Sequence, residues 1–207
     1  MRSVRKIASL SLLIGGAALA TVFFVPPVRN KFFTTKLWPW PLPWDTTAEE
    51  LSLLRELSKP GDVIIESNLH SWQWIALCLA TTRTSWVHAA LVDENKRLIT
   101  VDKEVVEADF DIYLRWGSTR LGLIRPPYAN AEQAKEAIAF ARSKLGRCYD
   151  PSFQDHSGNC NGLVGSSLVH AGIAVPQKQL FGKSIYAPDC FFQIANASRV
   201  WISDTAR

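Results

Sequence analysis

One cysteine stands in a short turn of small polar residues, Ser157-Gly-Asn-Cys-Asn-Gly162, directly before the apolar run that starts at Leu163. This pattern predicts a helix start, with a candidate helix over 161–171. A thiol in the first turn of a helix lies near free backbone N–H groups and the positive end of the helix dipole, which lower its pKa and can bind an oxyanion. Cys160 is therefore a candidate nucleophile, and the alternative is an ordinary structural cysteine.

A thiol nucleophile needs a base, and four histidines could supply one. His170 follows Cys160 in the same predicted helix, about 15 Å along its axis, and cannot reach the thiol. His70 and His156 lie in polar turns. His88 interrupts an otherwise apolar strand candidate, where burying an unpaired polar group costs about 1–3 kcal/mol. His88 is therefore the candidate base, with a hydrogen-bonded core histidine as the alternative.

The elements that must position these residues alternate between helices and strands. Thr46-Thr-Ala-Glu49 is a capping box, which predicts a helix that ends before Pro60-Gly61. Hydrophobic patterning predicts strands at 62–66, 86–92, 97–102 and 121–125 and further helices at 72–80, 130–144 and 161–171. This order predicts one α+β domain, in which a small antiparallel sheet packs with helices.

The start of the chain differs from the rest. A basic segment, Met1–Lys6, precedes the uncharged and mostly apolar residues 7–25, which predict a continuous apolar helix. Residues 1–29 are interpreted as a signal anchor or signal peptide, 30–44 as a Trp/Pro-rich linker, and 45–207 as the catalytic domain. Ala18-Leu-Ala20 offers a cleavage pattern, but the apolar run continues to Val25 and favours an uncleaved anchor. We expect the protein to be membrane-anchored or exported, with its domain outside the cytoplasm and periplasmic if bacterial.

The net charge of +4 belongs to this first segment. From residue 30 onward, 19 basic residues balance the chain's 19 acidic ones. A nucleic-acid-binding surface needs a basic stripe, so nucleic acid is not an expected partner. The N-terminal segment instead predicts contact with a membrane.

The four cysteines, Cys78, Cys148, Cys160 and Cys190, match no metal-ligand spacing, although an exported chain leaves a disulfide open. The sequence also contains no glycine-rich phosphate loop and no G-x-S-x-G nucleophile elbow. No metal and no organic cofactor are expected.

Five segments occur in an order that is similar to one known family. They are Pro60-Gly-Asp-Val-Ile-Ile65, Ser85-Trp-Val-His-Ala-Ala-Leu-Val92, Leu145-Gly-Arg-Cys-Tyr-Asp-Pro-Ser-Phe153, Asn159-Cys-Asn-Gly-Leu-Val164 and Ala187-Pro-Asp189. Together they resemble the circularly permuted papain-like (NlpC/P60-related) family of YiiX-type and YaeF-type proteins, in which the histidine precedes the cysteine. The chain has Asn161-Gly162 where YiiX-like members more often show Ser-Glu, which leaves the subfamily and the substrate open.

This resemblance implies a permuted papain-like fold and a cysteine hydrolase, amidase- or peptidase-like, that forms an acyl-enzyme. Cys160 would be the nucleophile and His88 the base, and the two should be adjacent. Asp102 would orient the imidazole, with Glu104 as the alternative. The substrate would be a peptide, an acyl-amide or a lipid, such as cell-wall peptide. Two other functions stay open, a non-catalytic peptide- or lipid-binding module and a lipid acyltransferase.

Overall fold

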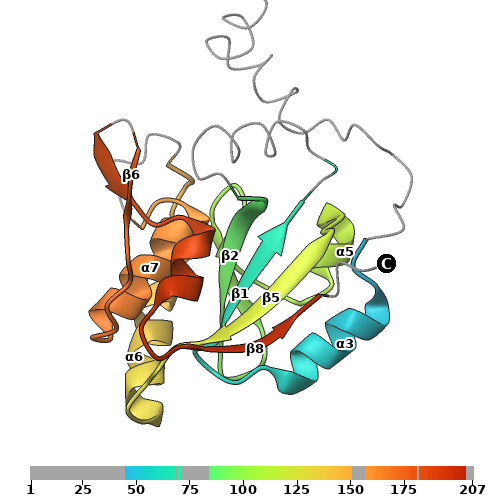
Figure 1. Ribbon diagram of the computed structural model, residues 1–207, viewed down its shortest axis with the longest axis horizontal. Helices are drawn as coiled ribbons and strands as arrows, with labels where there is room; N and C mark the ends of the chain where they lie inside the picture. The colour runs from blue at the N-terminus through green and yellow to red at the C-terminus, as the bar shows by residue number, and fades with distance from the viewer. Residues whose placement is uncertain (1–44, 69, 71–83, 151–156, 181, 204–207) are drawn as a thin grey trace, which may run out of the picture. The chain divides into compact units, whose positions relative to one another are not determined.

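In the computed structural model, residues 45–68, 70, 84–150, 157–180 and 182–203 are described. Their elements, in chain order, are α3 (Ala48–Leu57), β1 (Val63–Ser67), β2 (Trp86–Val92), β3 (Leu98–Val101), β4 (Val105–Ala108), α5 (Ile112–Trp116), β5 (Arg120–Arg125), α6 (Ala131–Arg142), α7 (Cys160–His170), β6 (Lys178–Leu180), β7 (Lys183–Ile185), the 3-10 helix η1 (Pro188–Gln193) and β8 (Ser198–Ile202) (Figure 1).

A six-stranded sheet forms the centre of the domain, in the order β4-β3-β2-β1-β5-β8. Every neighbouring pair in it is antiparallel. The central strand β1 pairs with β2 on one side and with β5 on the other, and its residues 63–66 are buried. β6 and β7 form a separate hairpin.

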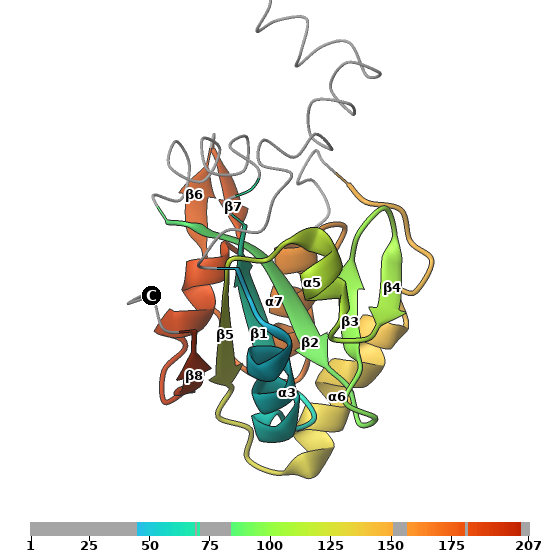
Figure 2. The same cartoon turned by 90° about the vertical axis from the view of Figure 1, so that its right-hand side faces the viewer.

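Helices cover both faces of this sheet, as Figure 2 shows. One buried cluster joins α6, α7 and η1 to the sheet and contains Ala89, Leu91 and Leu163. The other joins α3 and α5 to the opposite face and contains Ala90 and Tyr113. Successive residues of a strand point to opposite faces, so β2 contributes alternate side chains to the two clusters.

The start of β1 explains the Pro60-Gly61-Asp62 sequence. Gly61 has φ +84°, and a Cβ there would lie 2.7 Å from the ring of Tyr128, so the turn requires glycine. Asp62 is buried and accepts two hydrogen bonds from Arg125 of β5, at 2.9 and 2.7 Å. A paired buried carboxylate therefore fixes the entry of the chain into β1.

Helix α7 packs tightly against its surroundings through small residues. A Cβ on Gly165 would lie 2.3 Å from the ring of Tyr186, so that ring fills the space a side chain would need. At the far end of the helix, Gln133 of α6 donates a hydrogen bond to the carbonyl of Ala171 at 2.6 Å. The two helices therefore form one layer on this face of the sheet.

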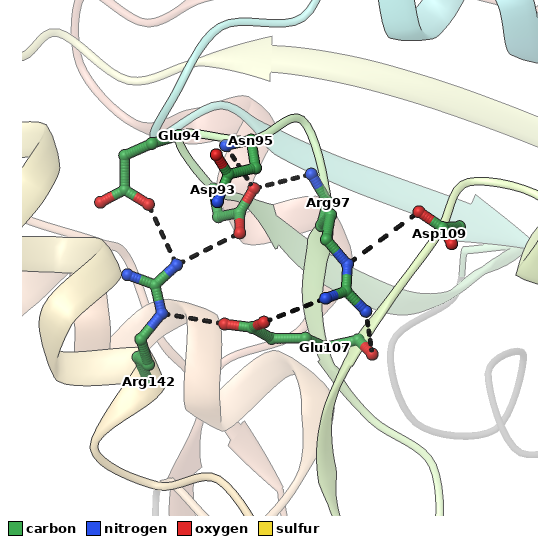
Figure 3. Close-up of polar contacts among 7 residues, drawn as sticks. All are labelled: Asp93, Glu94, Asn95, Arg97, Glu107, Asp109 and Arg142. Carbon is green, nitrogen blue, oxygen red and sulfur yellow. Dashed lines mark hydrogen bonds and ion pairs between the residues drawn. The ribbon is translucent and has the colours of Figure 1, made fainter.

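A network of ion pairs ties α6 to the strands beside it (Figure 3). Arg142 bonds to Glu107 of β4 at 2.8 Å, to Asp93 at 3.2 Å and to Glu94 at 3.0 Å. Arg97 also contacts Glu107, at 3.4 Å. Asp93 is fully buried, and its pairing with Arg142 compensates a negative charge that would otherwise be buried without a partner.

The structure confirms an α+β domain in which an antiparallel sheet packs with helices. The capping box forms one residue later than predicted, with Thr47 as N-cap and Glu50 as its partner. The sequence patterns did not predict β4, α5, β6, β7, η1 or β8. The predicted helices at 7–25 and 72–80, the linker 30–44, and Cys78 lie outside the described residues.

Replacing Gly165 by alanine tests the packing of α7. Alanine in an exposed helix interior stabilises relative to glycine, by up to about 1 kcal/mol. Here we expect the opposite sign, a loss of about 1–3 kcal/mol, because the new methyl group must displace the Tyr186 ring. Denaturant unfolding measures the change. Ser166→Ala, one residue further along the same helix, is the control and should leave the stability within about 0.5 kcal/mol. Equal stabilities for Gly165→Ala and wild type would contradict the expectation.

Candidate active site

Cys160 is the first residue of α7 and is 8% exposed. Asn159 caps the helix, and its side chain accepts a hydrogen bond from the backbone N–H of Gly162 at 2.9 Å. The thiol also lies within hydrogen-bond reach of the backbone of Ala89 in β2. The start of α7 therefore meets β2 at Ala89, the residue that follows His88.

His88 is partly buried in β2, and its ring is held by two contacts. Its Nε2 lies 2.6 Å from Oγ1 of Thr100 in β3. The ring also meets Trp116 edge to face, with 5.0 Å between centroids. A hydroxyl and an indole therefore fix the orientation of the imidazole.

The contact with Thr100 also indicates which nitrogen of His88 carries the proton. Thr100 donates its single hydroxyl proton to the carbonyl oxygen of Ala89, at 3.2 Å. With its proton on that carbonyl, the Thr100 oxygen accepts the proton of His88 Nε2. In that tautomer Nδ1 is unprotonated and free to act as a base.

Cys160 and His88 approach the same stretch of β2 from different directions. The alternation of the strand places His88 with Ala90, on the face that carries Trp116, whereas Cys160 belongs to the cluster on the α7 face. The contacts of the described residues include no hydrogen bond between the thiol and the imidazole. The predicted dyad therefore stays a prediction.

The structure places Asp102 and Glu104 on the turn from β3 into β4, where both are exposed. The backbone N–H of Asp102 donates to the carbonyl of Glu104 at 3.1 Å, which closes this turn. The hydrogen-bond partner of His88 in the structure is Thr100, and no contact of the described residues joins either carboxylate to it.

Burial dominates the proton affinity of the candidate nucleophile. It raises the pKa of the Cys160 thiol to about 11, against an ordinary value of 9.0. Backbone hydrogen bonds of Ala89 and Asn161 act in the lowering direction, and the charge of Glu66 acts in the raising direction. The expectation of a thiol with a lowered pKa is therefore wrong for this structure, because loss of water outweighs the helix terminus.

Burial also lowers the pKa of His88, to about 4 from 6.5. Both shifts favour the neutral forms, so the thiol and the imidazole are uncharged near neutral pH. In this resting state a proton has to move from sulfur to nitrogen during the attack, because no thiolate is preformed.

Sequence reasoning missed two residues that surround this site, Thr100 and Glu66, whereas a third, Tyr149, lies in a segment that carries the family resemblance. Thr100 is a polar residue in the apolar strand that follows the strand of His88, and it lies two residues before Asp102. That position was a usable signal. Glu66 is buried opposite His88 in the β1–β2 ladder. Tyr149 comes from the loop before α7, and the charge of Cys160 adds to the burial that raises its pKa.

The other cysteine and histidine residues lie in several parts of the domain. Cys148, Cys160 and Cys190 are free thiols. His170 contacts Phe140 at the end of α7, and His70 bonds to Asp45 at 2.7 Å. His156 lies outside the described residues.

Comparison with known proteins supports the fold. No protein-family model matches the chain, and no curated protein is similar to it. Among solved structures, the chain is similar to the metalloprotein YiiX from Escherichia coli O157:H7, with a TM-score of 0.58 and 20% sequence identity. The match covers 69% of this chain and 96% of YiiX. The chain therefore has a YiiX-like fold.

Two further properties bear on the expectations from the sequence. The described residues contain no group of three or more His, Cys, Asp or Glu side chains that could hold a metal ion. None of their helices is both long and apolar enough to cross a bilayer, and residues 7–25 are not among them.

The proton affinity of Cys160 can be measured directly. We expect the ultraviolet absorbance of its thiolate, taken as the difference between wild type and Cys160→Ser, to be absent at neutral pH and to grow toward pH 11. The unfolded chain releases this proton more easily, so the contribution of Cys160 to stability should be complete below about pH 9 and be lost toward pH 11. A thiolate signal near pH 7 would show that the helix terminus outweighs burial.

Proposed function

We propose that this protein is a cysteine hydrolase of the permuted papain-like kind, amidase- or peptidase-like. The observation that carries the proposal is the meeting of the first turn of α7 with β2, where the Cys160 thiol lies at the backbone of Ala89, the residue that follows His88 in the chain. The likeness to YiiX supports the fold that this chemistry needs. Cell-wall peptide or an acyl-lipid, with an amide or ester bond to cleave, is the proposed substrate class.

In the proposed reaction, His88 accepts the Cys160 proton on Nδ1 while the sulfur attacks the substrate carbonyl. Thr100 holds Nε2–H throughout, so the ring becomes an imidazolium without turning. The leaving amine or alcohol takes the proton back, and water then resolves the acyl-enzyme. The thiol and the imidazole must come within hydrogen-bond reach beside Ala89, and such contacts often tighten only once substrate is bound.

A non-catalytic binding module is the second candidate function. It is favoured by the thiol pKa of about 11 and by the different directions from which Cys160 and His88 reach β2. Such a module would bind a peptide or lipid without forming an acyl-enzyme. We also propose, from the sequence alone, that residues 1–29 attach the protein to a membrane and leave the domain outside the cytoplasm.

Site-resolved alkylation with iodoacetamide separates the two functions. We expect His88→Ala to slow alkylation of Cys160 by at least about tenfold near pH 8, because the base is lost. His170→Ala is the matched control and should change nothing, since His170 is exposed at the other end of α7. Cys148 is exposed and serves as an internal reference. Equal rates in wild type and His88→Ala would favour the binding module.

Thr100 and Asp102 can be compared as the residue that orients His88. Thr100→Val keeps the shape of the side chain but removes the hydroxyl, so Nε2–H loses its acceptor. We expect alkylation of Cys160 to fall about three- to tenfold, because the imidazole no longer keeps the productive tautomer. Asp102→Asn should have little effect. The reverse pattern would assign the orienting role to Asp102, as the sequence predicted.

A further inference from the structure

Glu66 is a buried carboxyl group that the proposed reaction does not yet use. It lies in β1, is 2% exposed, and pairs directly with His88 in the β1–β2 ladder. Side chains of directly opposed residues in an antiparallel pair share one face of the sheet, with Cβ atoms about 4.5–5.5 Å apart. The carboxyl group and the imidazole are therefore neighbours.

One set of contacts holds Glu66 and His88 together. Ser118 donates its hydroxyl proton to Glu66 at 2.6 Å. Asn68 hydrogen-bonds to Glu66 and also donates to the carbonyl of Trp116, at 3.1 Å. Trp116 in turn packs its ring against His88. A shift of either functional group would therefore disturb the support of the other.

The titratable groups near Glu66 come from three elements: His88 from β2, Tyr113 from α5 and, through its charge alone, Cys160 from α7. From β5 the residue opposite is Leu121, which is apolar. The hydroxyl of Tyr113 is buried, and the described residues offer it no hydrogen-bond partner. The contacts of the described residues pair Glu66 with no cation, so a proton on His88 would supply the missing positive charge.

The charge of Glu66 changes close to neutral pH. Burial raises its pKa from 4.5 to about 7, and the hydrogen bonds from Ser118 and Asn68 limit this rise because they favour the carboxylate. Above pH 7 a buried negative charge therefore lies next to the imidazole, and below pH 7 it is neutralised.

We propose that Glu66 is a positioning residue for this reaction, because its carboxylate stabilises the imidazolium that forms when His88 takes the Cys160 proton. The inference rests on the proposed function. In this step the S–H bond of Cys160 breaks, an N–H bond forms at Nδ1 of His88, and Glu66 stays ionised. Glu66 and His88 then form an ion pair that exists only while His88 holds the proton of Cys160.

Glu66 can influence Cys160 in two opposite ways, and the sign of its effect distinguishes them. Its charge raises the pKa of the thiol, so direct action on sulfur would slow the reaction of Cys160. Action through His88 would speed that reaction, because the base holds the proton better. Removal of the charge therefore gives opposite results for the two routes.

The experiment measures alkylation of Cys160 by iodoacetamide in the full chain, from about pH 5.5 to pH 9, relative to Cys148. For wild type we expect a rise through about pH 7, as Glu66 ionises. Glu66→Gln keeps an acceptor for Ser118 but removes the charge. It should slow alkylation near pH 8 by about tenfold, the equivalent of one pKa unit on the base, and abolish the step near pH 7. Glu136→Gln, at an exposed position of α6, is the matched control and should keep the step.

Two more variants separate positioning from a structural role. Ser118→Ala removes a hydrogen bond that favours the carboxylate, so it should raise the pKa of Glu66 and move the step to higher pH. A purely structural role would lower stability without moving this midpoint. Glu66→Gln combined with His88→Ala should react as slowly as His88→Ala alone, because both act on one group.

The possible outcomes are distinct. Slow alkylation in His88→Ala with unchanged or faster alkylation in Glu66→Gln would overturn the role of Glu66 and leave the proposed function in place. No effect of His88→Ala would refute the proposed function and the role of Glu66 with it. A midpoint that stays in place in Ser118→Ala would also overturn the inference.

Discussion

Close packing of α7 on β2 is the constraint on which the candidate site depends. The helix can bring the sulfur of Cys160 to the backbone of the strand because the strand residue there is Ala89, and because Gly165 leaves room for the ring of Tyr186 on the other side. Larger side chains at these positions would hold the helix away from the sheet, since a close-packed interior cannot absorb added volume without shifts of backbone. The approach of the Cys160 sulfur to the backbone of β2 is therefore a consequence of packing.

This packing sets the electrostatics as well. The N-terminus of a helix carries a partial positive charge of roughly half an elementary charge, which favours a thiolate. This effect is largest where solvent does not compete. Loss of solvent costs a buried charge more, so Cys160 and His88 both favour their neutral forms. The same argument makes Glu66 titrate near neutral pH instead of near 4.5. Cys160 and His88 thus carry little charge near neutral pH, whereas Glu66 gains its charge in that range.

The sequence predicted the class of fold and the places of Cys160 and His88 because these depend on local patterns. A polar turn before an apolar run indicates a helix start. A histidine in an apolar strand indicates a buried polar group that needs a hydrogen-bond partner. The partner of His88 was missed because it depends on contacts between strands: Asp102 looked suitable as a carboxylate, whereas in the structure the side chain of Thr100 reaches the ring. The raised pKa of Cys160 was missed for a related reason, since burial comes from α7, β2 and their neighbours together. A sequence motif gives residue types, but it does not give the contacts between strands or the burial of a side chain.

The position of β8 has a consequence for synthesis on the ribosome. Strands β1 to β5, with α3 and α5 on one face, precede α7 in the chain, and β8 joins the sheet beside β5 only after α7 has been made. The strand that carries His88 can therefore find its partners while the segment with Cys160 is still unmade or inside the exit tunnel. The thiol reaches its apolar surroundings only when the far face of the sheet is covered. A nascent chain of this topology would place His88 in the sheet before Cys160 enters its helix, so the two residues cannot meet until α7 has been made.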